Sequence, residues 1–216
     1  MHFTLTDLVT DITQNGAESG GDLLELELCE TSDSGGKGEF RFTVRDNGKG
    51  MTSEELKLAQ DPFVTDGIKH PHRKVGLGIP FLIQTAEQSG VGWKIESSKR
   101  SSAGQSPAEP STGSDGRRFK ESQFPYGTTV SAWFDLGNVD TPPVGDIPGM
   151  FRTVLLFSGP SEIVIHRIRE GAEERIDYEV RKTELVDALG DLEDTQSLIL
   201  LGQYLHSLEE GDDQGD

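Results

Sequence analysis

Val44-Arg45-Asp46-Asn47-Gly48-Lys49-Gly50-Met51 is the stretch that decides how the rest of the chain is interpreted. It follows an alternation of apolar and polar residues over 40–45, which predicts a half-buried strand. The strand ends at Asp46, and a carboxylate at a buried strand end needs hydrogen-bond donors around it. The glycines beside it allow a sharp turn and a close approach of the backbone to a ligand. Taken alone, the stretch is better explained as a surface turn, because Asp-Asn-Gly is common turn chemistry.

The composition of the 216-residue chain argues against several classes of protein. Its net charge of -18 and its pI near 4.6 disfavour a nucleic-acid partner, which needs clustered lysine and arginine, and an anionic membrane surface. No apolar run reaches the length of a membrane span, and the first residues lack the features of a signal peptide. The single cysteine, Cys29, precludes an internal disulfide and fits plain packing. We therefore expect a cytoplasmic protein with one domain and an extension, or two small domains.

A helix is predicted over residues 4–19, ahead of the opening stretch. Thr4 and Asp7 have the spacing of a capping box at its start, and leucines, valine and isoleucine form an apolar stripe along it. Asp11 and Asn15 lie one turn apart on another face of this helix. An ordinary solvated helix face has the same pattern, so these two residues point to a site only in combination with others.

A loop with an unexpected local charge follows the opening stretch. Thr52 and Glu55 first predict a short capped helix that ends near residue 59. Residues 61–75 then carry five potentially cationic side chains in an otherwise acidic protein, which suits a loop that lies over an anion. A mobile surface loop with incidental charge would look the same. His70 and His72 lack the neighbouring ligands of a metal site, so we do not expect them to bind metal.

Glycines lead directly into the next predicted helix. Gly76-Leu77-Gly78 precedes it, Pro80 fits its first turn and Gly90 fits its end. A helix start of this kind offers free N–H groups and a positive dipole end, which suit phosphate. Close packing of the helix on a sheet would explain the glycines equally well.

The middle of the chain predicts two strands around a polar insert. The strands cover 93–97 and 130–136, and Gly-Thr-Thr, with Thr128 and Thr129, opens the second. Residues 98–124 are rich in serine, glycine and proline and cannot bury enough apolar area to offset their ordering entropy. We expect them to form a disordered or poorly ordered insert.

A small αββα-like extension is predicted over residues 139–210, after a linker rich in proline and glycine. Its elements are a helix over 150–157, strands over 162–169 and 175–180, a short helix capped by Thr183, and a last helix with Leu198, Leu201, Leu205 and Leu208 on one side. The acidic run from Glu209 to Asp216 is expected to be solvated, and residues 211–216 to be a disordered tail.

In this order, the motifs resemble those of the GHKL superfamily, named for gyrase, heat-shock chaperone, histidine kinase and mismatch-repair ATPases. No motif is specific alone, but four of them occur in the right order over residues 1–136. The resemblance implies an α+β protein with the Bergerat fold, a two-layer α/β sandwich with a mixed sheet and helices on one face. It also implies a histidine-kinase-like ATP-binding domain over 1–138, interrupted by the insert, and we expect a stand-alone module.

The resemblance implies a site for ATP and Mg²⁺. Asp46 matches the aspartate that accepts a hydrogen bond from the adenine amino group, and an ionised carboxylate can only accept. Asn15 matches the asparagine that holds Mg²⁺ through its side-chain oxygen. The other matches are Gly48, Gly50 and Met51 near the base and sugar, Phe63 and Thr65 ahead of the lid, Lys74 or Arg73 and Gly76, Leu77 and Gly78 at the phosphates, and Thr128 or Thr129 beside Asp46.

The chain departs from the family pattern at the expected catalytic base. Hydrolysing members carry a glutamate one turn before the asparagine, and here that residue is Asp11, shorter by one methylene. A carboxylate is still capable as a base, although its shorter reach can lower the rate. ATP binding is therefore implied more strongly than hydrolysis. We expect a regulatory phosphotransferase acting on an unidentified partner protein. The alternatives are a non-catalytic nucleotide sensor and a weak ATPase working as a homodimer.

Overall fold

The chain folds into one mixed sheet with helices packed against it. The structure, a computed structural model, describes residues 4–33, 38–61, 78–89, 92–100, 125–172 and 174–210, and the backbone of 111–112. The strands are β1 (Leu23–Ser32), β2 (Gly38–Asp46), β3 (Trp93–Ser98), β4 (Ser111–Thr112), β5 (Gly127–Asp135), β6 (Glu162–Glu170) and β7 (Arg175–Arg181). The helices are α1 (Leu5–Ala17), α2 (Ser53–Gln60), α3 (Gly78–Gln88), α4 (Ile147–Leu155), α5 (Lys182–Leu189) and α6 (Thr195–Glu210).

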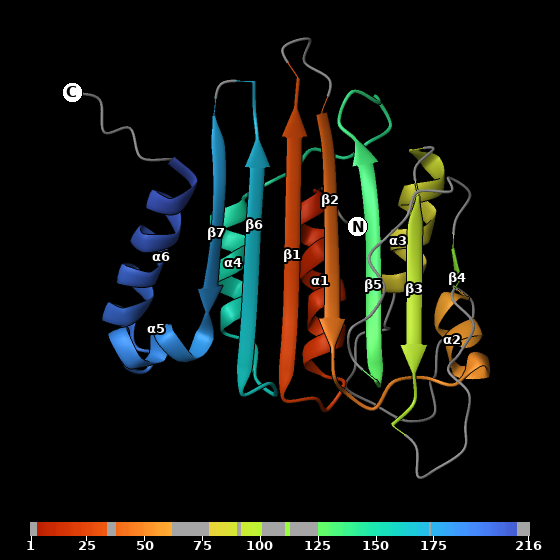
Figure 1. Cartoon of the computed structure of the whole chain (residues 1–216), viewed down its shortest axis with the longest axis horizontal. Helices are drawn as coiled ribbons and strands as arrows, with labels where there is room; N and C mark the ends of the chain where they lie inside the picture. Colours follow the sequence, from red (N-terminus) through yellow and green to blue (C-terminus); the bar gives the residue numbers. More distant parts are fainter. Residues whose placement is uncertain are drawn as a thin grey trace.

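The described strands form a seven-stranded sheet in the order β4-β3-β5-β2-β1-β6-β7. The pairing of β1 with β6 is parallel, and the other pairings are antiparallel. Figure 1 shows α1, α3 and α4 behind this sheet, and none of the described helices covers its front. The two-layer α+β arrangement and the mixed sheet are therefore confirmed. The pairing of Ser111–Thr112 with β3 was not expected from the sequence of the insert.

Strand alternation places the core between the sheet and the helices. Leu24, Leu26 and Leu28 of β1 pair with Asp46, Val44 and Phe42 of β2. All three leucines are at most 1 % exposed, because this side of the sheet is covered by α1 and its neighbours. Side chains of a strand alternate between its two faces, so the same register directs Asp46 to the helix side.

The helix starts that were predicted from capping boxes, at Thr4 and Thr52, are confirmed. Thr4 Oγ1 accepts the Asp7 N–H at 3.1 Å, and the Asp7 carboxylate accepts the Thr4 N–H at 3.1 Å. The corresponding distances for Thr52 and Glu55 at the start of α2 are 3.2 Å and 2.8 Å. Each capping box satisfies donors that a helix start leaves unpaired, within one turn of chain.

The expected cap at Thr183 is wrong. Helix α5 begins at Lys182, after Arg181, so Thr183 lies inside its first turn. The Thr183 hydroxyl donates to Glu162 Oε2 at 2.6 Å, and its N–H to Oε1 at 3.3 Å. A carboxylate from β6 therefore takes the place of a local cap at this helix start.

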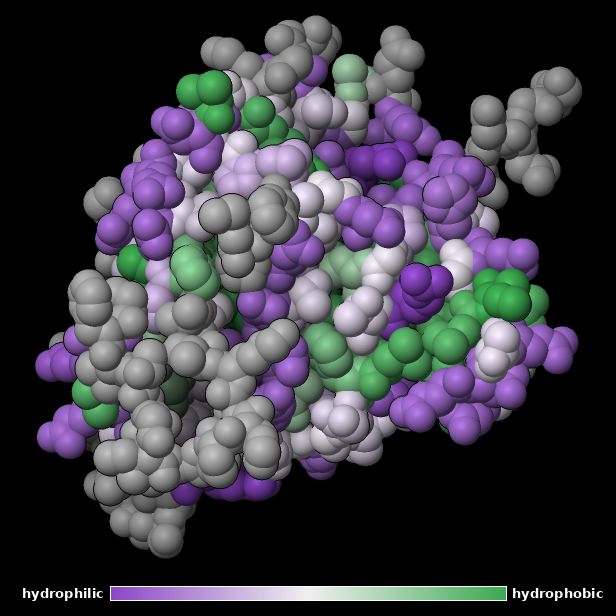
Figure 2. All heavy atoms as spheres, turned by 180° about the vertical axis from the view of Figure 1, so that it is seen from behind, coloured by the Kyte–Doolittle hydropathy of each residue, from purple (hydrophilic) through white to green (hydrophobic). Residues whose placement is uncertain are grey.

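The strands of the expected extension continue the same sheet. β6 lies parallel to β1, with Leu24 beside Ile163 and Leu28 beside Arg167. In Figure 2, which shows the helix side, a band of apolar side chains reaches the right-hand edge, where α5 and α6 lie. The exposed large apolar side chains of these two helices are Val186, Ile199, Leu200 and Tyr204. None of the described helices is long and apolar enough to cross a membrane.

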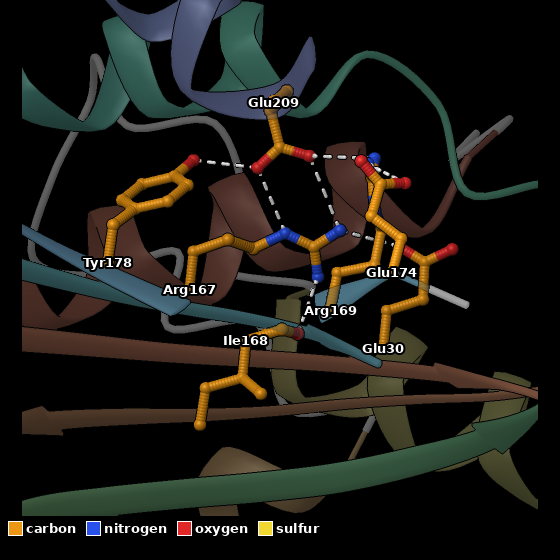
Figure 3. A network of polar contacts seen from close by, with 7 residues as sticks. All are labelled: Glu30, Arg167, Ile168, Arg169, Glu174, Tyr178 and Glu209. Atoms are coloured by element: carbon orange, nitrogen blue, oxygen red, sulfur yellow. Dashed lines mark hydrogen bonds and ion pairs between the residues drawn. The ribbon is translucent and has the colours of Figure 1, made fainter. Parts of the chain in front are cut away.

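A fully buried arginine fastens the end of α6 to the sheet (Figure 3). Arg167 Nε donates to Glu209 at 3.1 Å, Nη2 donates to Glu30 at 2.7 Å, and Nη1 donates to the Ile168 carbonyl at 3.0 Å. The Tyr178 hydroxyl donates to Glu209 at 2.7 Å. Burial beside Glu209 raises the pKa of Tyr178, so this hydroxyl stays protonated and remains a donor.

Glu209 was expected to be solvated, as part of an acidic run, and this expectation is wrong. It belongs to α6, and its side chain is only 11 % exposed because it is held by Arg167. A buried guanidinium needs a carboxylate partner. For this reason the first residue of the acidic segment, Glu209, is largely buried instead of solvated.

Candidate functional site

A cavity of about 230 Å³ lies between α1 and the end of the sheet where β2 stops and β5 begins. Its lining residues come from α1 and the turn after it (Ile12, Asn15, Gly16, Glu18, Ser19), from β2 and the segment after it (Val44, Asp46, Lys49, Gly50, Met51), from α2 and α3 (Ala59, Ile79), and from β5 (Thr128, Val130). Apolar walls with a few polar groups are typical of a small-molecule site. Five of the predicted residues line it together: Asn15, Asp46, Gly50, Met51 and Thr128.

Asp46 is the buried acidic group of this cavity. It is 4 % exposed, and its Oδ1 accepts the Gly48 N–H at 2.9 Å. Burial raises the pKa of the Asp46 carboxyl, and the hydrogen bond from Gly48 lowers it in part. Ionised, the carboxylate offers acceptors and no donor, so it suits a ligand group that donates hydrogen bonds.

The predicted glycines after β2 are required by close contacts. A Cβ added at Gly48 would collide with the Ser19 hydroxyl, and one added at Gly50 would collide with the Ser98 carbonyl. Gly50 also has a φ of +62°, a region that favours glycine. Ser19 Oγ itself is buried beside Asp46, and its contact with that carboxylate lowers the pKa of Asp46 in part.

Asn47, for which the sequence suggested no separate role, holds this turn in place. Its Oδ1 accepts the N–H groups of Asp22 and Leu23, both at 3.0 Å. Its Nδ2 donates to the Asp22 carboxylate at 2.6 Å. The asparagine between Asp46 and Gly48 thus ties the site to the start of β1 and leaves ligand contacts to its neighbours.

Ser97 is a further residue that the sequence analysis missed. Its hydroxyl accepts the Met51 N–H at 2.8 Å and lies 2.9 Å from Thr128 Oγ1. One signal was present: alternation places Ser97 on the same face of β3 as Trp93 and Ile95, which are both buried. A serine in an apolar row of this kind indicates a specific polar partner.

The structure brings only one of the two candidate threonines to the cavity. Asp46 pairs directly with Thr128 across β2 and β5, so both side chains lie on the helix side. Thr129 is 2 % exposed and faces the opposite side of the sheet, beside Arg45 and Glu96. Thr128 is therefore the residue that can act beside Asp46.

The start of α3 forms the other end of the site. A Cβ added at Gly78 would lie 3.0 Å from Asn15 Nδ2 and 3.6 Å from Asp11 Cβ, so this helix start packs against both predicted residues. Asp11 is half-buried and borders the cavity without lining it. The positive end of a helix suits an anion such as phosphate. Phe63, Thr65, Lys74, Gly76 and Leu77 lie outside the described residues.

The donor groups at this end fit Mg²⁺ bound with a nucleotide. Asn15 lines the cavity and carries an amide oxygen, and carboxylates of Asp11 and Glu18 lie on the same helix and the turn after it. Mg²⁺ takes oxygen ligands and is commonly held by one or two protein groups together with phosphates. In the described part of the chain, no group of three or more His, Cys, Asp or Glu side chains could hold a metal.

The chain is similar to a known protein family and to known proteins. The model of the family described as histidine kinase-, DNA gyrase B-, and HSP90-like ATPase matches residues 3–138. The DNA mismatch repair protein MutL of Thermus aquaticus is 30% identical over 101 residues, which are 47% of this chain and 18% of that protein. The chain therefore spans less than a fifth of the length of this relative. A solved structure, the Aquifex aeolicus MutL ATPase domain complexed with ADP, aligns at a TM-score of 0.40 and 13% identity, over 84% of this chain and 65% of that chain. The resemblance to the GHKL superfamily is confirmed by the family model, and the chain belongs to the histidine kinase-, DNA gyrase B- and HSP90-like ATPases.

Proposed function

We propose that this chain binds Mg-ATP, with the adenine at Asp46 and the phosphates at the start of α3. The observation that carries the proposal is the Asp46 carboxylate, 4 % exposed at the wall of the cavity and fixed by Gly48. Adenine presents an amino donor that such an acceptor can select. Asn15 would hold Mg²⁺, which when bound neutralises phosphate charge.

Calorimetry of ADP and GDP, each with Mg²⁺, tests this proposal. We expect the wild type to bind ADP more tightly than GDP. Equal affinity for the two nucleotides would overturn the proposal, since the pocket would then not select the base through Asp46. Adding EDTA should weaken ADP binding, because the Asn15 amide contributes to binding through the cation.

For the fate of ATP, hydrolysis has the most support. The family is one of ATPases, and Asp11 lies one turn before Asn15, beside the helix start that would hold the phosphates. There it could take a proton from an attacking water. Release of inorganic phosphate from ATP by the purified chain, lost on Asp11→Asn with ADP affinity retained, would support this role.

Transfer of the γ-phosphate to a partner protein is the second candidate. It differs from hydrolysis in one measurable product, because radiolabel from γ-labelled ATP would appear on protein instead of in free phosphate. A nucleotide sensor would give neither product. Light scattering with and without ATP then tests whether a homodimer forms when nucleotide is bound.

A further inference from the structure

We propose that Ser97 is a positioning residue that sets the base selectivity of this site, by fixing the direction of the Thr128 hydroxyl and holding the loop at Met51. The inference rests on the proposed adenine-nucleotide site and adds a residue outside the cavity lining.

Ser97 joins the two segments that flank Asp46. Ser97 is only 3 % exposed, and its Oγ accepts the Met51 N–H at 2.8 Å. The same Oγ lies 2.9 Å from Thr128 Oγ1 and 3.2 Å from the Gly127 carbonyl oxygen. One hydroxyl therefore connects the loop after β2 to the first residues of β5.

The proton inventory of these groups limits what Thr128 can do. The Met51 N–H can only donate, so it uses one acceptor position of Ser97 Oγ. The Gly127 carbonyl can only accept, so its contact uses the single proton of Ser97, and the proton in the contact with Thr128 is that of Thr128. Thr128 therefore donates to Ser97 Oγ and presents only acceptor lone pairs to the cavity.

This arrangement presents two acceptors side by side. Asp46 supplies one and Thr128 the other, and their strands pair directly at these two residues. Adenine offers the complement, an amino group with two N–H donors, which can reach the acceptors directly or through one water. Guanine carries a carbonyl oxygen at the same ring position, and this oxygen cannot donate to either acceptor. Removing Ser97 Oγ frees Thr128 to turn either way, so the site should lose discrimination more than it loses binding.

The chain offers a matched control on the other face of the same sheet. Ser131 is 2 % exposed, and its hydroxyl lies 3.1 Å from the Thr43 hydroxyl. Ser131→Ala thus removes a buried hydroxyl and its contact with a threonine on a neighbouring strand, as Ser97→Ala does for Thr128, without touching the cavity. Thr128→Val removes the hydroxyl that Ser97 is proposed to direct.

The experiment measures the ratio of GDP to ADP dissociation constants by calorimetry with Mg²⁺. We expect this ratio to fall about tenfold in Ser97→Ala, as for the loss of one hydrogen bond. It should fall similarly in Thr128→Val. The double variant should show no further fall, because both substitutions remove the same interaction. Ser97→Thr, which restores a hydroxyl, should recover part of the ratio. Ser131→Ala should keep the wild-type ratio.

Two outcomes separate the inference from the proposal beneath it. A wild type that does not prefer ADP overturns the proposed function itself. A wild type that prefers ADP, with Ser97→Ala weakening both nucleotides equally, overturns the inference and leaves Ser97 a structural residue. Hydrogen exchange gives an independent readout: the Met51 amide should exchange faster in Ser97→Ala than in wild type or Ser131→Ala, and equal rates would also count against the inference.

Discussion

Replacing Asp46 by asparagine should weaken adenine binding and stabilise the fold in the same variant. In the structure, the Gly48 N–H is donated to Asp46 Oδ1 at 2.9 Å. An amide at this position has a single acceptor oxygen, which this N–H will hold. The amide NH₂ then takes the place of Oδ2 and faces the amino group of adenine, so that two donors oppose each other.

The loss in affinity follows from the hydrogen bond that is removed. A hydrogen bond to a charged group contributes roughly 1.5–3 kcal/mol, which corresponds to a ten- to hundredfold weaker ADP affinity for Asp46→Asn. GDP should be affected less, because its carbonyl oxygen can accept from the new NH₂. Calorimetry with both nucleotides measures the two changes.

The gain in stability follows from the burial of the carboxylate. Because burial raises the folded-state pKa of Asp46, the folded chain holds this proton more tightly than the unfolded chain does. The wild type therefore loses stability as the pH rises from the ordinary carboxyl value of 3.8 through the raised folded value. Asp46→Asn has no such proton, so urea unfolding at pH 7 should show a more stable variant with a weaker pH dependence.

The exposed Asp135 provides the control. Its Oδ1 accepts the Gly137 N–H at 2.8 Å, the same local geometry as Asp46 and Gly48, at the far end of β5. Asp135→Asn should change neither nucleotide affinity nor the pH dependence attributed to Asp46. The reasoning is refuted if Asp46→Asn retains wild-type ADP affinity, or if its affinity falls together with its stability, since unfolding would then explain the loss.

Three further predictions concern the phosphate end, the turn and the anchor of α6. Asp11→Asn should keep the ADP affinity of the wild type and lose phosphate release from ATP; undiminished release would exclude Asp11 as the base. Gly50→Ala should cost about 1–3 kcal/mol for its left-handed backbone and more for its collision with the next strand. Gly20 also has a positive φ, of +81°, but open space around it, so urea unfolding should show a smaller loss of stability for Gly20→Ala than for Gly50→Ala. Equal losses of stability in the two variants would contradict the collision at Gly50. Glu209→Ala should lower the free energy of unfolding by about 3–5 kcal/mol, because it leaves the buried Arg167 without its main partner. Adding Arg167→Met should restore part of the lost stability. A loss near that of an exposed ion pair, below about 1 kcal/mol, would contradict this anchor.

Features that depend on neighbours in the sequence were predicted well. The capping boxes of Thr4 and Thr52 close within three residues, and both are present. The strands predicted from alternating apolar and polar residues are also present, because the alternation indicates which side chains face the core. Thr183 and Glu209 were misassigned for the opposite reason. Their partners lie 21 and 42 residues away, in β6, and only folding brings them together.

The sequence by itself determined the order of the motifs, the family resemblance and the choice of Asp46 as the central residue of the site. It could not decide between Thr128 and Thr129, nor connect Ser97 to Met51. Adjacent residues of a strand point to opposite faces, and the face is set by the register with strands that lie far away in the chain. The pairing of Asp46 with Thr128 fixes that register, and the tertiary structure alone therefore decides which hydroxyls lie on the cavity side of the sheet.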